Sequence, residues 1–295
     1  MNISAVKFDS INFKSTTRTT YHSNSEGQFV LPTYDRKLNI RVSPDIRMIC
    51  SNSTNFFRRD LNWDDIGKIF NRQFPHGKVN IYDFACSDGS EAFSLVIALI
   101  EQLGEKKASR FFPIHASDID PEIIKMANSG KIIATEDDIL SIEGMTKKGD
   151  IKKYFTITPV CGGKYILSPK EILTKNVIFK QEGINQGLDK INKNEQNIIL
   201  ARNFWKYLSV ENLAESSFKL SEKANNKTLL LIGNFDLQKN KDPFFLSALG
   251  FDSHCDEDEN ILELKECNSI KDKVVWQDYI MKNYYQYIPS YIKTF

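Results

Sequence analysis

Residues 82–99 read YDFACSDGSEAFSLVIAL, and this stretch decides the fold class. A β-rich apolar run ends in five small or polar residues around Gly89, and an apolar helical pattern then begins. A buried strand that turns sharply into a helix is the first unit of an α/β sheet.

The chain on either side of this stretch alternates strands and helices. The first predicted elements are a strand at 79–85, a helix at 90–104, a strand at 111–118 and a helix at 121–130, which Pro121 opens and Gly130 ends. Further on, the pattern predicts strands at 176–181, 196–202 and 227–235 and a helix near 210–224. Because crossover helices join parallel strands, we predict a doubly wound, mostly parallel, Rossmann-like α/β sheet.

Three segments fall outside this regular pattern. Residues 1–50 are rich in Ser, Thr and Asn with scattered breakers, which predicts a strand-rich N-terminal extension with loops. Residues 131–175 are polar and glycine-punctuated, and KYILS at 164–168 predicts a small inserted β-hairpin subdomain. We therefore expect the main domain to cover 51–240, and residues 241–295 to complete or cover the sheet.

The composition excludes several classes of protein. The chain has 295 residues, and its 39 Lys and Arg against 38 Asp and Glu give no basic field that would favour nucleic acid. Its five cysteines form no CxxC pair and no metal spacing with the histidines, so we predict neither a disulfide framework nor a metal site. No signal-peptide pattern is present, and no apolar run approaches the roughly 20 residues that span a bilayer, so we expect a cytosolic protein without membrane insertion.

The turn after the first strand is the expected ligand site. In open α/β sheets, ligands bind beyond the carboxyl ends of the strands, and the small side chains of Ala85, Ser87 and Gly89 let a ligand approach the backbone there. The sequence CSDGSE has neither the GK[ST] ending nor the GxGxxG spacing of phosphate sites, and Glu91 would repel a phosphate. A cationic or hydroxyl-rich ligand fits this turn better.

A second acid, Asp118, ends the next predicted strand. It occupies the position of the ribose-binding acid of nucleotide sites, although it lies 29 residues after Gly89 instead of about 20. Together, Glu91 and Asp118 indicate an adenosine that has a positive group. Each acid also has a structural interpretation, because Glu91 would complement the helix dipole and Asp118 or Asp120 would cap the following helix.

Four motifs follow one another along the chain: NSTNFFRRD (52–60), ACSDGSEAFSLVIAL (85–99), HASDIDPEIIKMANSGKI (115–132) and ILARNFWKYLS (199–209). In this order they resemble the motifs of the chemotaxis receptor glutamate methyltransferases, the CheR-type family, whose members use S-adenosylmethionine and have a class I methyltransferase fold. The resemblance covers about residues 50–236, and residues 152–181 follow the family's insertion and next strand.

The resemblance implies S-adenosylmethionine (SAM) as cofactor and S-adenosylhomocysteine (SAH) as product. It places Glu91 at the amino-acid end of the cofactor, Asp118 at the ribose, and Gly183 and Ile184 where the family has Asn-Leu beside the adenine. The implied cofactor-binding residues are Asn52, Thr54, Arg58, Ala85, Ser87, Gly89, Glu91, Asp118, Ile119, Gly183, Ile184, Arg202 and Asn203. The implied catalytic residues are Arg58, Arg202 and Tyr207.

The sequence also departs from the family. Residues 1–50 are too short and too strand-like for the helical N-terminal domain that helps to engage receptors. GNFD at 233–236 replaces Gly-His-Ser-Glu, and Asp88 and Ser90 replace Thr and Glu of the first motif. These departures argue against a chemoreceptor as the substrate and leave a protein with a reactive carboxylate as the expected partner.

A carboxylate acceptor suits the residues present. The Glu carboxylate has a reference pKa of about 4.3, so it is ionised at neutral pH and needs no general base, only alignment. Arg58 would orient that carboxylate, bind the cofactor's own carboxylate, or lie on the surface beside Arg59. Tyr207 would shape the channel, donate a hydrogen bond, or simply be a half-buried aromatic, and Arg202 would pair with a nearby acid.

The predicted function is therefore methylation of a protein carboxylate. Two alternatives stay open. The first is a non-catalytic module that binds SAM or SAH. The second is a small-molecule O- or N-methyltransferase, because this fold accepts many substrates; its aromatic C-terminal segment would cover the pocket or pack against the sheet.

Overall fold

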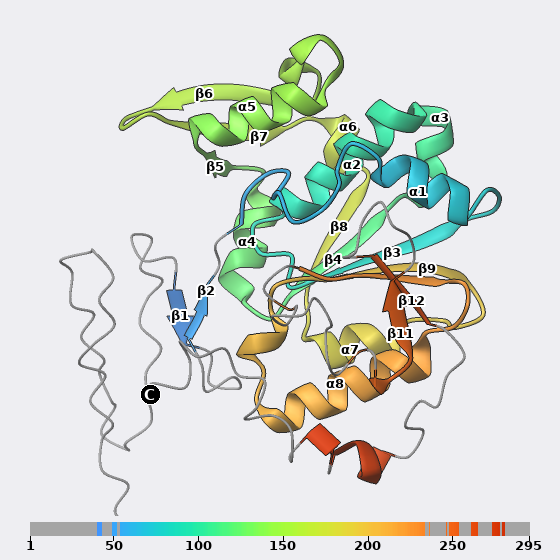
Figure 1. The fold of residues 1–295 in the computed structure, drawn as a ribbon. Coiled ribbons are helices and arrows are strands. Elements are labelled where there is room, and N and C mark those ends of the chain that lie inside the picture. The colour runs from blue at the N-terminus through green and yellow to red at the C-terminus, as the bar shows by residue number, and fades with distance from the viewer. Residues whose placement is uncertain are drawn as a thin grey trace, which may run out of the picture.

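The structure is a computed structural model that describes residues 40–42, 49–51, 54–233, 236, 246, 248–253, 261–264, 273–277 and 279–280. Its centre is a seven-stranded sheet (Figure 1). From one edge to the other, the strands are β11 (Phe251–Ser253), β12 (Ile261–Leu264), β10 (Thr228–Leu231), β9 (Gln196–Ala201), β3 (Val79–Phe84), β4 (Ile114–Asp118) and β8 (Val177–Gln181).

The sheet is mostly parallel and doubly wound, as predicted. Strands β10, β9, β3, β4 and β8 pair in parallel, whereas β12 is antiparallel to both of its neighbours, β10 and β11. The chain runs from β3 outward through β4 to β8, and then continues on the other side of β3 with β9 and β10. The strand order therefore reverses at β3, which is where open α/β sheets bind ligands.

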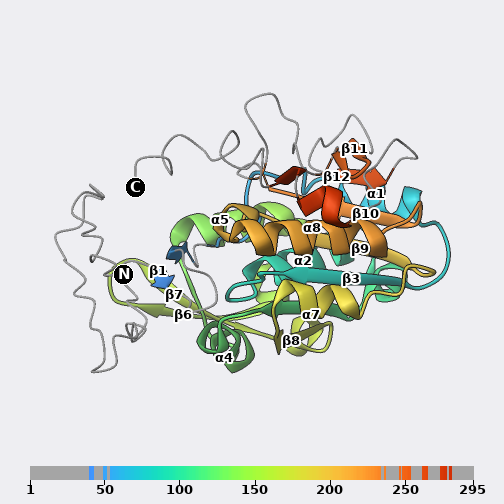
Figure 2. The ribbon, with the colours of Figure 1, turned by 90° about the horizontal axis from the view of Figure 1, so that it is seen from below.

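Helices cover both faces of the sheet. The helices are α1 (Ile66–Gln73), α2 (Ser90–Leu103), α3 (Glu105–Ala108), α4 (Pro121–Ser129), α5 (Glu136–Met145), α6 (Glu171–Thr174), α7 (Ile184–Asp189) and α8 (Val210–Lys223). Helices α7 and α8 lie in front of the sheet when it is seen from below (Figure 2). Alternate residues of β3 face opposite sides, so Ile81 joins the hydrophobic cluster around α1 and α2, and Phe84 joins the cluster around α8.

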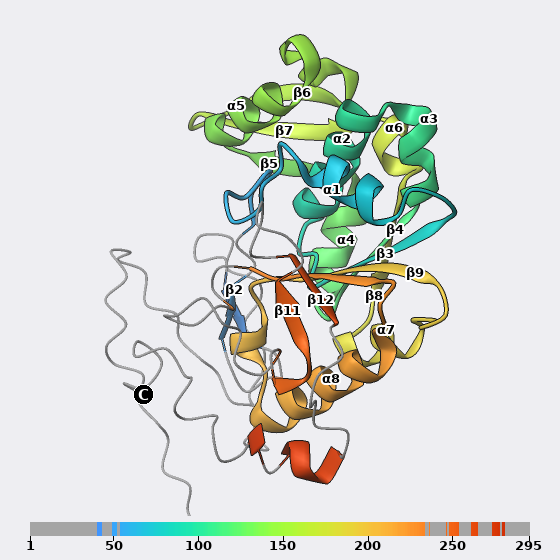
Figure 3. The same ribbon diagram turned by 45° about the vertical axis from the view of Figure 1, so that its right-hand side comes forward.

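The predicted insertion is larger than a hairpin. Strands β5 (Ile132–Ala134), β7 (Lys164–Pro169) and β6 (Phe155–Val160) form a three-stranded antiparallel sheet, which lies with α5 beside α2 (Figure 3). The polar composition hid α5 from the sequence analysis. The helix begins with a capping box, in which Thr135 and Asp138 satisfy each other's backbone N–H groups.

The two terminal extensions are described in part. Strands β1 (Ile40–Val42) and β2 (Ile49–Ser51) pair antiparallel, and most of residues 1–50, with the strands predicted there, lies outside the described residues. Near the other end, Trp276 is fully buried and its Nε1 donates to the Ala214 carbonyl at 3.0 Å. The division into domains stays a prediction. In the described part of the chain, every helix is too short or too polar to traverse a bilayer.

Candidate functional site

The turn that follows β3 has an unusual backbone. Ala85, Ser87 and Gly89 all have positive φ angles, of 57°, 53° and 89°. A side chain at Gly89 would also collide with Phe179, because a Cβ placed there would lie 2.5 Å from the phenylalanine Cζ. This turn therefore requires glycine at its last position, and it holds Ala85 and Ser87 in the left-handed region that L-residues seldom adopt.

Asp118 at the end of β4 faces this turn. Its Oδ2 accepts the Ser87 N–H and its Oδ1 accepts the Asp120 N–H, both at 3.0 Å. Burial is the main cause that raises the pKa of Asp118 to about 6. The cap of α4 is made by Asp120, which accepts the Glu122 and Ile123 N–H groups. The capping interpretation thus applies to Asp120, whereas Asp118 joins β4 to the turn.

Arg202, just after β9, lies between two carboxylates. Its Nη1 donates to Glu91 and its Nη2 donates to Asp60, and the arginine side chain is only 1% exposed. Asn203 donates from Nδ2 to the same Asp60 carboxylate at 2.8 Å. We call Asp60, Glu91, Arg202 and Asn203 the Arg202 cluster. Burial raises the pKa of Glu91, and the Arg202 charge opposes that shift.

The expectation that Arg202 pairs with a nearby acid is therefore confirmed. The sequence analysis considered Asp60 only as part of a motif and missed its place in the cluster. To predict this pair, one must know that residue 60 lies beside the end of β9 in the fold. No local pattern in the sequence provides that information.

Residues 54–60, which we call the Arg58 segment, approach the cluster from the side of α2. Arg58 and Thr54 are half-buried, and the Arg58 carbonyl accepts the Trp63 Nε1–H at 2.8 Å. The Arg58 charge lowers the pKa of Glu91. Asn52, also predicted as a cofactor contact, lies outside the described residues.

Asp83 of β3 is a further buried acid that the sequence analysis did not single out. It is 1% exposed, and neither of its carboxyl oxygens has a hydrogen-bond partner in the protein; the same is true of Arg202 Nε. Burial, and then the Glu91 charge, raises the pKa of Asp83 well above its usual range. The only signal in the sequence was an acid within a strand that was predicted to be buried.

These groups fit the cofactor that the sequence implies. Asp83, Glu91 and Asp118 supply carboxyl oxygens at the carboxyl ends of β3 and β4, and SAM has ribose hydroxyls, an ammonium and a sulfonium to meet them. The unpartnered atoms of Asp83 and Arg202 are polar groups that a polar ligand would satisfy. The residues expected to hold SAM would thus be these acids together with Arg58.

The predicted adenine contacts also lie together. Gly183, which precedes α7, is close to Ile119, because a Cβ at Gly183 would lie 3.9 Å from Ile119 Cδ1. Ile184 packs against the hydrophobic cluster around α8.

Tyr207, predicted as a catalytic residue, is half-buried in a 3-10 turn after β9. The structure thus places these residues after β4, β8 and β9, at the same edge as Asp118 and Arg202.

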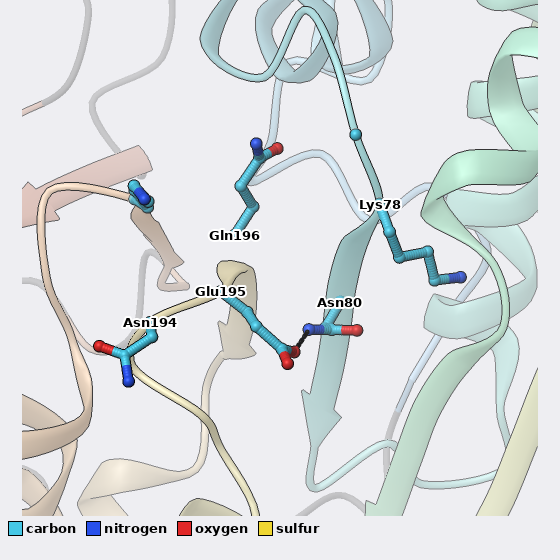
Figure 4. A pocket seen from close by; sticks show the side chains of 7 residues that line it. Lys78, Asn80, Asn194, Glu195 and Gln196 are labelled. Atoms are coloured by element: carbon cyan, nitrogen blue, oxygen red, sulfur yellow. Dashed lines mark hydrogen bonds between the residues drawn. The ribbon is translucent and has the colours of Figure 1, made fainter.

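A pocket of about 430 Å³ lies at the opposite, amino-terminal ends of the strands. Figure 4 shows its side chains, among which Asn80 donates to Glu195 at 2.6 Å, while Lys78 points away from them. Gly77, Lys78, Asn80, Asn194, Glu195, Gln196 and Lys227 line it. It is separated by the length of the strands from the predicted site residues, and we assign it no part in their chemistry.

The chain is similar in sequence to known methyltransferases. Residues 52–249 match the family model described as CheR methyltransferase, SAM binding domain. A chemotaxis protein methyltransferase of Listeria monocytogenes is 25% identical over 211 residues, which cover 69% of this chain and 72% of that protein. One of Borreliella burgdorferi is 25% identical over 205 residues, which cover 66% and 68%.

A shorter stretch of 85 residues is 33% identical to a chemotaxis protein methyltransferase of Salmonella typhimurium and covers 29% of this chain and 28% of that protein. Among solved structures, the plantazolicin methyltransferase BpumL in complex with SAH aligns at 12% identity with a TM-score of 0.31. That alignment covers 78% of this chain and 61% of the BpumL chain.

Proposed function

The chain belongs to the CheR methyltransferase family, and from this premise we propose that it transfers a methyl group from SAM to a carboxylate side chain of a protein. The observation that supports the proposal most directly is the gathering of Asp83, Glu91 and Asp118 with Arg202 at the strand ends where this fold binds ligands. A cytosolic location and a glutamate acceptor are parts of the same proposal.

Each residue then has a defined task. Asp118 accepts hydrogen bonds from the ribose hydroxyls of SAM, and Glu91 faces the ammonium at the amino-acid end of SAM. Arg202, fixed by Asp60, keeps the Glu91 carboxylate in one orientation. When bound, SAM supplies an electrophilic methyl group on a sulfonium.

The acceptor carboxylate is oriented by Arg58, whose planar guanidinium can form two parallel hydrogen bonds with it. Proton transfer is not required, because a carboxylate is already ionised at neutral pH. This is consistent with the positions of the two described histidines. His115 stacks on Tyr82 near the start of β4, and His76 is exposed before β3, so neither lies at the carboxyl ends of the strands.

The test is labelling of a cell lysate with tritiated SAM in the presence of the purified protein. We expect a labelled protein whose tritium is released by mild base, because methyl esters hydrolyse easily and N-methyl groups do not. Asp118→Ala is the matched control and should abolish the labelling. Labelling that survives mild base would contradict carboxyl methylation.

One observation favours a second candidate, a non-catalytic module that binds SAM or SAH. Arg202 is buried and both of its Nη atoms donate to carboxylates of the chain, so this predicted catalytic residue is engaged within the protein. Calorimetry that shows SAM binding, together with a lysate that acquires no label, would favour this module over an enzyme.

A further inference from the structure

One carboxylate of the inserted subdomain contacts the Arg58 segment. Asp138, which is buried near the start of α5, accepts the Phe56 N–H on Oδ1 at 3.1 Å. Its other oxygen, Oδ2, accepts the Thr135 N–H at 2.9 Å and the Thr135 hydroxyl at 2.8 Å. The same side chain therefore caps α5 and binds a segment that lies 82 residues earlier in the chain.

The next residue of that segment, Phe57, is also fixed from outside. Its φ is 49°, in the left-handed region that aromatic residues avoid, and its N–H donates to the Ser94 hydroxyl of α2 at 3.0 Å. Ser94 in turn donates to the Ser90 carbonyl at 2.7 Å. Two successive N–H groups are thus bound by two different elements, and an unfavourable backbone conformation persists only where its surroundings determine it.

Ring contacts support the same turn. The Phe56 ring packs edge-on against Phe155 of β6 with centroids 5.5 Å apart, and the Phe57 ring packs edge-on against Trp63 at the same distance. Trp63 also bonds the Arg58 carbonyl. The insertion therefore makes two contacts with Phe56, a hydrogen bond to its N–H and an aromatic contact with its ring. Both contacts support the backbone that places Arg58.

Resting on the proposed function, we infer that Asp138 is a positioning residue of the cofactor site. It fixes the Phe56 N–H, and thereby sets where the following residues place Arg58 and the Asp60 carboxylate that bonds Arg202. The inserted subdomain is then part of the framework of the site, although none of its side chains needs to touch the cofactor.

The experiment compares Asp138→Ala with Thr135→Ala. Both variants weaken the cap of α5, but only the first removes the bond to Phe56, so Thr135→Ala reports the effect of the cap alone. Titration calorimetry measures the Kd of SAM, and hydrogen exchange with mass spectrometry follows peptides that cover residues 54–60 in the cofactor-free protein. Asp138→Asn keeps one oxygen that can accept the Phe56 N–H.

We expect Asp138→Ala to weaken SAM binding at least about fivefold, the effect of one lost buried hydrogen bond, and Thr135→Ala to leave it within about twofold. Amide exchange over residues 54–60 should accelerate about tenfold in Asp138→Ala, because the bound N–H groups open locally. Asp138→Asn should restore part of both properties, which a purely structural loss would not do.

Equal weakening in Asp138→Ala and Thr135→Ala would overturn the inference, because the helix cap alone would then account for it. Unchanged exchange over residues 54–60 in Asp138→Ala would overturn it as well. A wild-type protein that binds no SAM would instead refute the proposed function, and the exchange measurement would still decide whether Asp138 fixes the segment. If Asp138→Ala does not fold, Asp138→Asn takes its place in the experiment. Amide exchange over residues 54–60 must then be faster in Asp138→Asn than in the wild type.

Discussion

At the scale of single residues, one buried guanidinium pairs with two carboxylates, of which Asp60 is buried and Glu91 is partly exposed. Arg202 donates to Glu91 at the start of α2 and to Asp60 in the segment before α1. The Arg202 guanidinium also lies 5.7 Å from the centroid of the Trp63 ring. Two acids against one base leave the cluster with an excess of negative charge when all three groups are ionised. A ligand with a positive group would reduce that excess, and this is the charge balance that the proposed cofactor offers.

Removing the base should therefore destabilise the fold. We expect Arg202→Met to lower the free energy of unfolding by about 3 to 5 kcal/mol, because the buried Asp60 carboxylate and the partly exposed Glu91 carboxylate would both lose their partner. Urea denaturation measures the change. The triple variant Arg202→Met, Asp60→Asn, Glu91→Gln should recover part of it. A loss below about 1 kcal/mol in the single variant would contradict burial of the cluster.

The acid at the end of β4 should make cofactor binding depend on pH. The pKa of Asp118 is raised to about 6 in the folded protein, so the free energy of unfolding falls as the pH rises from about 4 to about 6. The ionised carboxylate is nevertheless the better acceptor for the hydroxyl groups of the ribose. We therefore expect the Kd of SAM to increase about tenfold from pH 7 to pH 5. Calorimetry across this range measures the change.

Asp118→Asn is the control for this dependence, because its amide oxygen does not titrate. This variant should bind SAM weakly at both pH values. The ratio of its Kd at pH 5 to its Kd at pH 7 should be near one after correction for the titration of the other acids in the site. A wild-type Kd that does not change between pH 7 and pH 5 would show that the ionised form of Asp118 is not needed for binding.

At the scale of elements, the periodicity of the sequence predicted the strands and the long helices well. Helix α2 begins at Ser90 and ends before Gly104, and α4 begins at Pro121 and ends before Gly130, as the breakers predicted. Helix α5 was missed because its face toward the core is narrow, with only Asp138 and Ile142 buried. The sequence TEDD at 135–138 fits a capping box, so a search for helix caps would have found it.

The insertion is joined to α2 by a second buried acid, Glu101. This carboxylate accepts from the hydroxyl of Tyr154, from Nζ of Lys153 at 2.8 Å and from the Lys147 N–H at 3.0 Å. Tyr154→Phe should cost about 2 kcal/mol of unfolding free energy, because its buried hydroxyl bonds a charged acceptor. Lys153→Met should cost less than about 1 kcal/mol, since the lysine is partly exposed to water.

Urea denaturation of both variants measures these costs. Equal costs for Tyr154→Phe and Lys153→Met would mean that water reaches Glu101, and that the buried hydroxyl has no special part in joining the insertion to α2.

At the scale of the whole molecule, the sequence predicted which strand ends would lie together but not which side chains would pair there. The motif order placed Asp118, Gly183 and Arg202 after successive strands, and parallel strands bring such positions to one edge. The pairing of Arg202 with Asp60, and of Asp138 with Phe56, joins residues 142 and 82 positions apart. Such contacts follow from the packing of whole elements, so no local pattern specifies them.

Trp276 and Ile280 belong to the hydrophobic core around α8. Trp276 is fully buried, and its Nε1 bonds the Ala214 carbonyl and the Ser217 hydroxyl. We expect Trp276→Ala to lower the free energy of unfolding by about 3 to 5 kcal/mol through the cavity it leaves. Thermal and urea unfolding measure the loss. A protein as stable as the wild type would show that Trp276 is not packed on α8.

The sheet has a consequence for synthesis that follows from the position of β12. This strand lies between β10 and β11, so β11 has no neighbour to pair with until β12 has been made. A chain that is released at residues 254–260 displays Phe251 and the open flank of β10 together. Premature stops in this interval should therefore give chains that associate with one another or recruit chaperones.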